Sequence, residues 1–206
     1  WSHQYVQQVN QVQCTINPES MWGTNGPDSN LFGLEPNFGC CTANMHQGWP
    51  KFAAHLWMST ADQGIAAVSY GPSTARFQPR GTPVSVTLET DYPFRETLRF
   101  VVQAERPVRF PLWLRIPGWA DGATAALDGG AGKSVKSGTF HRLDREWKGR
   151  TEVVLRLPMR AKTSARYNRA VAVERGPLVS GKFHFAHSLC KNKSARAHRK
   201  HDQENT

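Results

Sequence analysis

The sequence predicts an α+β fold in which one helical segment is followed by an antiparallel β-sandwich. Apolar residues recur at helical spacing only from about residue 43 to residue 58, and from Gly64 to about Val179 they alternate with polar residues. Turn residues divide this alternating region into many short stretches, which is typical of a sandwich. The chain has 206 residues, 39% of them hydrophobic, enough for one large or two small globular domains.

The helix is expected over residues 43–58. One face of it would carry the apolar residues Met45, Trp49, Phe52, Ala53 and Leu56. Thr42 can act as the N-cap, because its hydroxyl can accept a hydrogen bond from a free backbone N–H of the first turn. Pro50 removes a backbone donor, so we expect it to kink the helix or to divide it in two.

Nine strands are expected in the alternating region. They cover residues 65–70, 84–90, 97–104, 108–116, 124–127, 139–144, 151–157, 162–166 and 170–174. Turn signals separate these stretches, for example at Asp91-Tyr92-Pro93, Glu105-Arg106-Pro107 and Pro117-Gly118. This spacing favours short antiparallel strands joined by tight turns.

The pattern divides the chain into three regions. Residues 1–62 contain a long turn-rich segment before the helix, and such a segment in a compact domain is more often functional than idle. Residues 63–180 form the predicted β-sandwich domain. Residues 181–206 have no periodicity and hold six basic residues, so their composition cannot offset the entropy cost of ordering and predicts a disordered tail.

The net charge of +10 is uneven along the chain. Residues 1–62 carry one basic and four acidic residues, whereas residues 63–180 carry 19 basic and 10 acidic ones. Arginines there alternate with apolar residues, as at Arg109, Phe110 and Leu112, which is the pattern of a solvated strand face. We therefore expect no nucleic-acid partner, and polyanion binding is the third-ranked alternative. No segment approaches the ~18 apolar residues of a membrane span, so no membrane partner is expected.

The adjacent cysteines Cys40 and Cys41 are the most unusual feature of the sequence. Neighbouring cysteines cannot close an ordinary disulfide without straining the peptide between them, whereas two thiolates can bind a soft metal such as zinc. Their position before the predicted helix favours the thiolate form. The alternative is a pair of buried structural thiols, because Cys14 and His46 do not complete a four-ligand set by their spacing.

Three separated motifs follow one another along the chain. They are EPNFGCCTANM at residues 35–45 with GWPKF at residues 48–52, LWLRIPGW at residues 112–119, and VERGPLV at residues 173–179. Together they resemble glycoside hydrolase family 127, the β-L-arabinofuranosidase-like enzymes. The resemblance covers about residues 1–179.

This resemblance implies that residues 1–62 are the C-terminal part of an (α/α)-barrel catalytic domain and that an antiparallel β-sandwich follows. It implies retaining hydrolysis of β-L-arabinofuranosides or related glycosides. In that family the first cysteine of the pair is the nucleophile and the second binds the same zinc ion, which assigns Cys40 as nucleophile and zinc ligand and Cys41 as zinc ligand. Tyr5 stands where the family has a sugar-contacting tyrosine, and an ordinary half-buried tyrosine is the alternative.

The chain also departs from the family pattern. The general acid/base Glu and a Glu-x-Cys pair of zinc ligands are expected ahead of the cysteine pair, and no Glu-x-Cys occurs in the 206 residues. Glu19 and Glu35 are the only glutamates before Cys40, and neither has the expected context. We therefore expect a fragment whose partner is the N-terminal barrel of the same protein. Because general acid catalysis is worth about 10²–10⁴-fold, the fragment alone should be nearly inactive.

A second function class is a non-catalytic β-sandwich module that binds carbohydrate or has a structural role. Such a module would use exposed tryptophan side chains as a platform for sugar rings, and Trp113, Trp119 and Trp147 are the candidates. Burial in the core is the commoner fate of such residues. A structure distinguishes the two cases by the exposure of these indoles.

Overall fold

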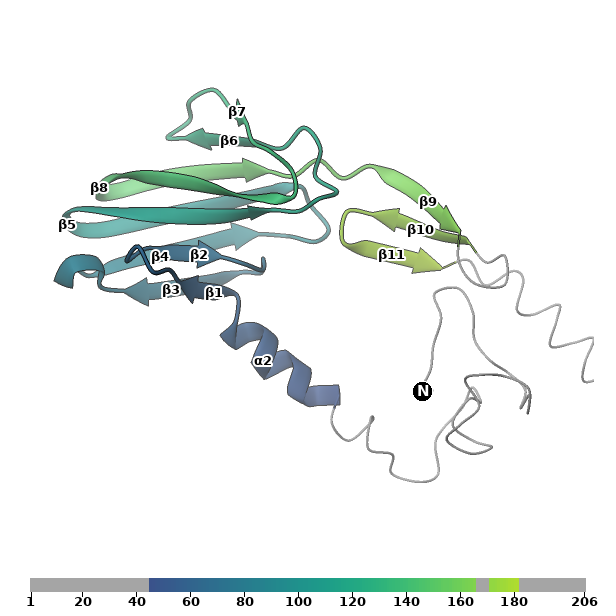
Figure 1. The fold of residues 1–206 in the computed structure, drawn as a ribbon, viewed down its shortest axis with the longest axis horizontal. Coiled ribbons are helices and arrows are strands. Elements are labelled where there is room, and N and C mark those ends of the chain that lie inside the picture. The colour runs from purple at the N-terminus through teal and green to yellow at the C-terminus, as the bar shows by residue number, and fades with distance from the viewer. Residues whose placement is uncertain (1–44, 166–170, 182–206) are drawn as a thin grey trace, which may run out of the picture. The chain divides into compact units, whose positions relative to one another are not determined.

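The computed structural model describes residues 45–165 and 171–181 (Figure 1). The described chain divides into two compact units, of which one spans Trp49–Arg160 and the other includes residues 161–165 and 171–181. The larger unit holds β1 (Trp57–Ser59), β2 (Ile65–Ala67), β3 (Ser73–Phe77), η2 (Pro79–Gly81), β4 (Val84–Thr90), β5 (Thr97–Ile116), β6 (Thr124–Leu127), β7 (Lys133–Ser134) and β8 (Thr139–Arg156). A short helix, α2 (Gly48–Ala54), leads into β1 and follows a 3₁₀ turn, η1 (Met45–Gln47).

The strands of the larger unit form one hydrogen-bonded sheet. Its order is β1-β2-β5-β8-β6-β7, and β4, which also pairs with β3, joins β5 as well. All pairings are antiparallel except that of β2 with β5, in which Ile65–Ala67 runs parallel to Leu112–Leu114. The sheet is therefore mixed.

The two long strands β5 and β8 run side by side through the whole sheet (Figure 1). The first half of β5, Leu98–Ala104, pairs with β4, and the second half pairs with β2. The register between β5 and β8 shifts between Ala104 and Val108, where Pro107 offers no N–H to the ladder. Such a bulge bends a strand, so each long strand contributes to two parts of the sheet.

Aromatic contacts show that these two parts face each other. Trp57 of β1 belongs to the part that contains β2, and its ring meets Phe100 of the other part edge-on at 6.1 Å between centroids. Phe77 of β3 belongs to the part that contains β4, and it meets Phe110 of the other part at 5.1 Å. The sheet therefore folds over itself into two layers around one core.

The core follows from the period-two pattern of the strands. Along β5 the inward residues Leu98, Phe100 and Val102 are fully buried, and the residues between them are partly exposed. Phe110 and Trp147 are buried as well, and burying side chains of this size contributes about 1.5–3 kcal/mol each. The alternation that predicts strands thus also places the core.

The smaller described sheet contains β9 (Ala161–Ala165), β10 (Val171–Arg175) and β11 (Leu178–Gly181). β10 lies in the centre and pairs antiparallel with both neighbours. Glu174 of β10 accepts a hydrogen bond from the Ser164 hydroxyl at 2.7 Å. It also forms an ion pair with Lys162 at 3.3 Å. These contacts join β9 and β10 on one face.

The predicted fold class is wrong in its helical part. The described residues are mostly β, with one α-helix of seven residues, and they contain no part of an (α/α) barrel. The helix expected over residues 43–58 ends at Ala54, because Trp57 enters strand β1 and its indole packs on Phe100. Pro50 lies in the first turn of α2, where no backbone acceptor is available for an N–H.

The expected antiparallel sandwich is correct only in part. Two layers do enclose one core, but they belong to a single mixed sheet because β5 and β8 continue through both. The turn expected at Glu105-Arg106-Pro107 is instead a bulge within β5. The boundaries proposed at residues 62 and 180 stay predictions.

Candidate functional site

The residues that the sequence analysis assigns to catalysis lie outside the described residues. Cys40, Cys41 and Tyr5 all precede Met45, where the described structure begins. The assignment of a nucleophile, of zinc ligands and of a sugar contact therefore stays a prediction. What the structure does describe is the segment immediately after the cysteine motif.

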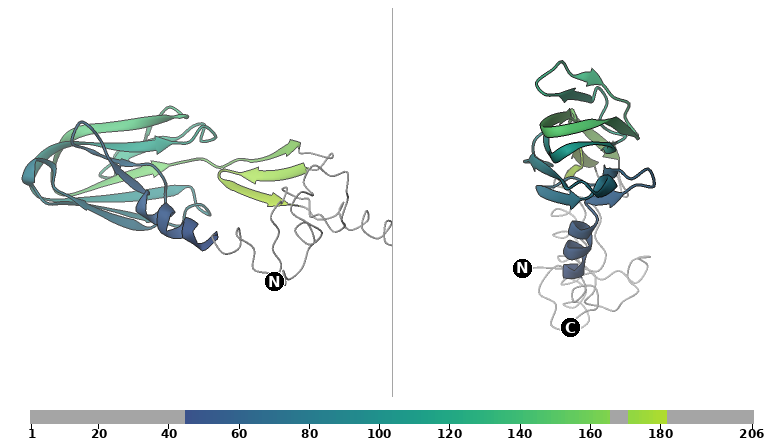
Figure 2. Two further views of the ribbon diagram at one scale, coloured as in Figure 1. Left: turned by 60° about the horizontal axis from the view of Figure 1, so that its bottom comes forward. Right: turned by 90° about the vertical axis from the view of Figure 1, so that its left-hand side faces the viewer.

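That segment, α2, extends away from the sheet instead of lying against one of its faces (Figure 2). No residue of the helix is buried. Trp49 and Phe52 are 74% and 46% exposed, and their rings meet edge-on at 6.5 Å. Part of the expected apolar helix face therefore forms on α2, but within the described residues it is exposed to solvent.

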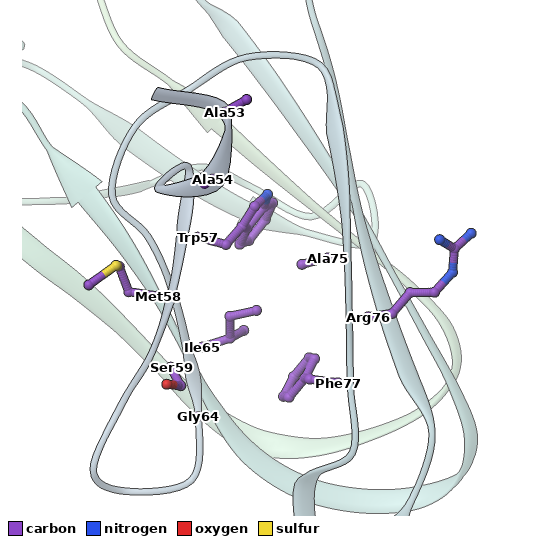
Figure 3. Close-up of a pocket in the computed structure, with 10 residues that line it drawn as sticks. All are labelled: Ala53, Ala54, Trp57, Met58, Ser59, Gly64, Ile65, Ala75, Arg76 and Phe77. Atoms are coloured by element: carbon purple, nitrogen blue, oxygen red, sulfur yellow. The ribbon is translucent and has the colours of Figure 1, made fainter. Parts of the chain in front are cut away.

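A pocket of about 290 Å³ lies where α2 joins the sheet (Figure 3). It is lined by Ala53 and Ala54 of α2, Trp57, Met58 and Ser59 of β1, Gly64 and Ile65 beside them, and Ala75, Arg76 and Phe77 of β3. Strands β1 and β3 are both edge strands, one in each layer, so the pocket is the open side of the folded sheet.

The lining of this pocket is unsuited to acid–base or nucleophilic chemistry. It contains no carboxylate, histidine or cysteine, and the polar side chains are those of Ser59 and Arg76, together with the indole N–H of Trp57. Figure 3 shows the Arg76 side chain directed away from the space enclosed by Trp57, Ile65 and Phe77. The indole Nε1 of Trp57 already donates to the Ser73 hydroxyl at 3.0 Å. The described residues therefore place no carboxylate, histidine or cysteine at this pocket.

The three candidate tryptophans of the sugar-platform hypothesis are not exposed platforms. Trp147 is fully buried, stacks on Phe110 and donates its N–H to the Phe110 carbonyl at 2.9 Å. Trp119 is partly buried and packs against the core. Trp113 is half-buried, and the guanidinium of Arg142 covers its ring at 5.4 Å from the centroid.

A polar cluster surrounds Trp113 on the outer face of the sheet. Arg142 pairs with Asp62 at 3.5 Å and with Asp144 at 2.9 Å, and Asp144 also accepts from Arg109 at 3.0 Å. The Thr60 hydroxyl donates to the Asp62 carboxylate, and this bond is the main reason why the pKa of Asp62 lies below its ordinary value. The pKa of Asp144 is lowered too, chiefly by the hydrogen bond from Arg109.

Two further ionisable groups have shifted pKa values because of burial. Burial lowers the pKa of His141, which lies beside Leu114 in the register of β5 and β8. Burial raises the pKa of Tyr70, whose hydroxyl donates to the Arg115 carbonyl. Neither group lies at the pocket, so these shifts are structural.

The part of the chain that the structure describes contains no group of three or more metal-binding side chains. It also contains no helix that is long and apolar enough to cross a membrane. The donor chemistry of Cys40 and Cys41 suits zinc, since thiolates are preferred zinc ligands, but two sulfurs alone do not complete a four-coordinate site.

Residues 64–159 match the family described as beta-L-arabinofuranosidase, GH127 middle domain. The folded two-layer sheet is thus similar to the middle domain of that family. The resemblance to glycoside hydrolase family 127 is confirmed for these residues. No curated protein matches the chain.

Solved structures have a similar fold. A GH127 β-L-arabinofuranosidase from Geobacillus stearothermophilus T6 is 29% identical, with a TM-score of 0.60 over 68% of this chain and 23% of that one. A glycoside hydrolase (22% identity, TM-score 0.64) matches 81% of this chain and 28% of its own length. A GH127 β-arabinofuranosidase (22% identity, TM-score 0.57) matches 70% and 26%. The chain spans about a quarter of the length of these proteins.

The sequence analysis missed the cluster around Trp113. Register explains why these groups meet: Trp113 lies directly opposite Arg142, and Pro111 lies opposite Asp144, so the two charged residues share the outer face. The alternation of charged and apolar residues predicts that face. It does not predict that Asp62, 80 positions earlier, reaches Arg142.

Proposed function

We propose that this chain is part of a retaining glycoside hydrolase that cleaves β-L-arabinofuranosides or related glycosides and uses Cys40 as its nucleophile. The observation that carries the proposal is the order of two features along the chain. The cysteine pair is followed, after α2 and β1, by residues 64–159, which match the GH127 middle domain.

The proposed reaction has two steps. In the first, the Cys40 thiolate attacks the anomeric carbon, so that a C–S bond forms while the glycosidic C–O bond breaks and a general acid protonates the leaving oxygen. In the second, water attacks the same carbon, loses a proton to a base, and returns the thiolate. Two displacements at one carbon restore its configuration, which is the retaining outcome.

Cys41, together with Cys40, is proposed to bind zinc. Bound zinc keeps a coordinating thiol ionised at neutral pH, and this matters because the thiolate is the reactive form. Tyr5 is proposed to contact the sugar. The described residues contain no group of three or more side chains that could complete a zinc site. They also place no carboxylate or histidine at the pocket beside α2 that could act as the acid/base. Within this proposal the two-layer sheet is a scaffold for the segment that carries the cysteines.

The test measures hydrolysis of 4-nitrophenyl β-L-arabinofuranoside by the full-length gene product that contains these residues. Cys40→Ser should lower kcat by about 10³-fold or more, because removing a nucleophile abolishes the first step. The matched control is Cys14→Ser, which removes a thiol outside the motif and should leave kcat within about threefold. A Cys40→Ser protein with wild-type activity would contradict the proposal.

Zinc is tested separately. Metal analysis should give one zinc per chain for the wild type and markedly less for Cys41→Ser, while Cys14→Ser keeps the wild-type content. The 206 residues alone should show almost no hydrolysis, since their sequence contains no Glu-x-Cys. The non-catalytic carbohydrate-binding alternative receives no support from Trp147, Trp119 or Trp113, which are buried, packed against the core or covered by Arg142.

A further inference from the structure

Residues 49–63 form a peripheral element of the larger unit, here called the strap. It comprises most of α2, strand β1 and the turn that leads to β2. The match to the GH127 middle domain begins at Gly64, immediately after the strap. The strap thus lies next to the matched domain in sequence but outside it.

The backbone attachment of the strap is slight. Among the described strands, β1 has three residues, lies at the edge of the sheet and pairs with β2 alone, which is also three residues long. The Leu56 carbonyl accepts from the N–H of Val68 at 3.0 Å and from that of Ser69 at 3.4 Å. By contrast, β5 and β8 pair along nearly their whole length on both sides of the bulge. Backbone hydrogen bonds at the edge of a sheet open at lower free energy than those in its centre.

One side chain anchors the strap to the core. The ring of Trp57 packs edge-on against Phe100, and its Nε1 donates to the Ser73 hydroxyl of β3. Figure 3 shows this indole at the open side of the sheet, across the pocket from Phe77. Trp57 therefore ties the edge of one layer to the edge of the other. Its neighbour Leu56 is also buried.

A second attachment lies at the other end of the strap. Asp62 in the turn pairs with Arg142 of β8 at 3.5 Å, while Arg142 stays over the Trp113 ring and pairs with Asp144. Arg142 is thus held in place by groups outside the strap, and Asp62 meets a guanidinium that is already oriented. The pair is partly exposed, so it is weaker than the Trp57 anchor.

We propose that the strap opens as a unit while residues 64–160 remain folded, and that Trp57 and the Asp62–Arg142 pair hold it closed. Opening removes the indole from Phe100 and enlarges the pocket beside β3 into an apolar slot. The strap follows Cys41 after seven residues, so the proposed motion lies close to the cysteine pair in sequence. The opening itself does not depend on the proposed chemistry.

Hydrogen exchange on the full chain, read residue by residue by NMR, tests this. The amide of Val68 reports on the strap because its acceptor is the Leu56 carbonyl. The amide of Leu157, a fully buried residue, donates to the Glu96 carbonyl at 2.9 Å beside the central β5–β8 pair and reports on the sheet. In the wild type, Val68 should exchange at least tenfold faster than Leu157 after correction for intrinsic rates. Trp57→Leu should speed the exchange of Val68 by a further tenfold or more and change that of Leu157 by less than twofold.

A pair of arginine variants keeps the test decisive should Trp57→Leu fail to fold. Arg142→Gln removes the partner of Asp62 and should speed Val68 exchange about threefold at low salt. Arg109→Gln removes a different ion pair on the same face, that with Asp144, and should leave Val68 unchanged. Equal exchange of Val68 and Leu157 in the wild type, or acceleration of both together in the variants, would show that the strap opens only with the whole unit and would overturn the proposal.

Discussion

Trp147 contacts Phe110 twice, through its ring and through its indole N–H. The two rings stack with centroids 5.4 Å apart and planes 24° from parallel, and Nε1 donates to the Phe110 carbonyl at 2.9 Å. In the register of the sheet Trp147 lies opposite Val108, the first paired residue after the bulge in β5. The fully buried Trp147 side chain thus holds both the ring and the backbone of Phe110 close to Val108, where β5 resumes its pairing with β8 after the bulge.

Trp147→Phe should destabilise the chain by about 1–3 kcal/mol. The smaller ring keeps part of the stacking, but the N–H is lost and a cavity opens where the indole stood. Guanidinium denaturation followed by circular dichroism measures the change. Phe140→Leu, at a side chain that is 44% exposed, is the control and should change stability by less than about 0.5 kcal/mol. Equal effects of the two substitutions would contradict this reading of the core.

Gly64→Ala should destabilise the chain by about 2 kcal/mol or more. A Cβ at this position would lie 2.2 Å from the Pro111 carbonyl oxygen and 2.5 Å from the Pro111 ring, so the β2–β5 pairing would have to shift. Gly71→Ala is the matched control, because nothing lies within 4 Å of a Cβ there. Melting temperatures of the two variants compare them directly, and a normal melting temperature for Gly64→Ala would show that Pro111 can move.

His141 should make the stability of the chain depend on pH below about 6.5. Burial lowers its pKa in the folded state, so the unfolded chain binds this proton more readily. The contribution is fully present above the unfolded pKa and is lost as pH falls from about 6.5 towards the lower folded value. His141→Gln should flatten the stability profile between pH 7 and pH 5, measured by urea denaturation. A variant profile as steep as that of the wild type would assign the effect to another group.

Glu152 should contribute a second pH dependence at lower pH. Its pKa lies below the ordinary value, chiefly because Arg99 donates a hydrogen bond to its carboxylate at 2.6 Å. Stability from this pair is therefore present above the ordinary carboxyl range and is lost as pH falls through the lowered pKa. Arg99→Gln should reduce the loss of stability between pH 5 and pH 3. Lys136→Gln, at an exposed lysine, offers a charge-matched control that should keep the wild-type slope.

The sequence predicts those strands in which apolar and polar residues alternate between clear turn signals. β4 and β6 have the expected bounds, because each carries the alternating pattern between clear turn signals. The sequence analysis does not predict β1, β3, β7 or β11, although each of them pairs with the strand next to it in sequence. β1, β3 and β7 contain no buried residue, so they lack the alternation of buried apolar and exposed polar residues that indicates a strand. Trp57 shows the difficulty: it falls within the helix expected over residues 43–58, but packing on Phe100 places it in strand β1.

The candidate site is a different case. Cys40 and Cys41 are predicted as site residues from the local sequence alone, because adjacent cysteines are rare and the motif around them resembles that of the family. Contacts between distant residues, such as Asp62 with Arg142, depend on strand register and on the path of a turn. Alternation indicates which residues share a face but not which of them meet.

The continuity of β5 and β8 limits how this domain can be recombined with its relatives. Both layers are built partly from the same two stretches of backbone, so a crossover within residues 97–116 or 139–156 would combine parental halves in both layers at once. Exchanges just before Gly64 or after Arg160 keep β5 and β8 from the same parent. Chimeras joined at those two places should inherit the middle domain as one indivisible block.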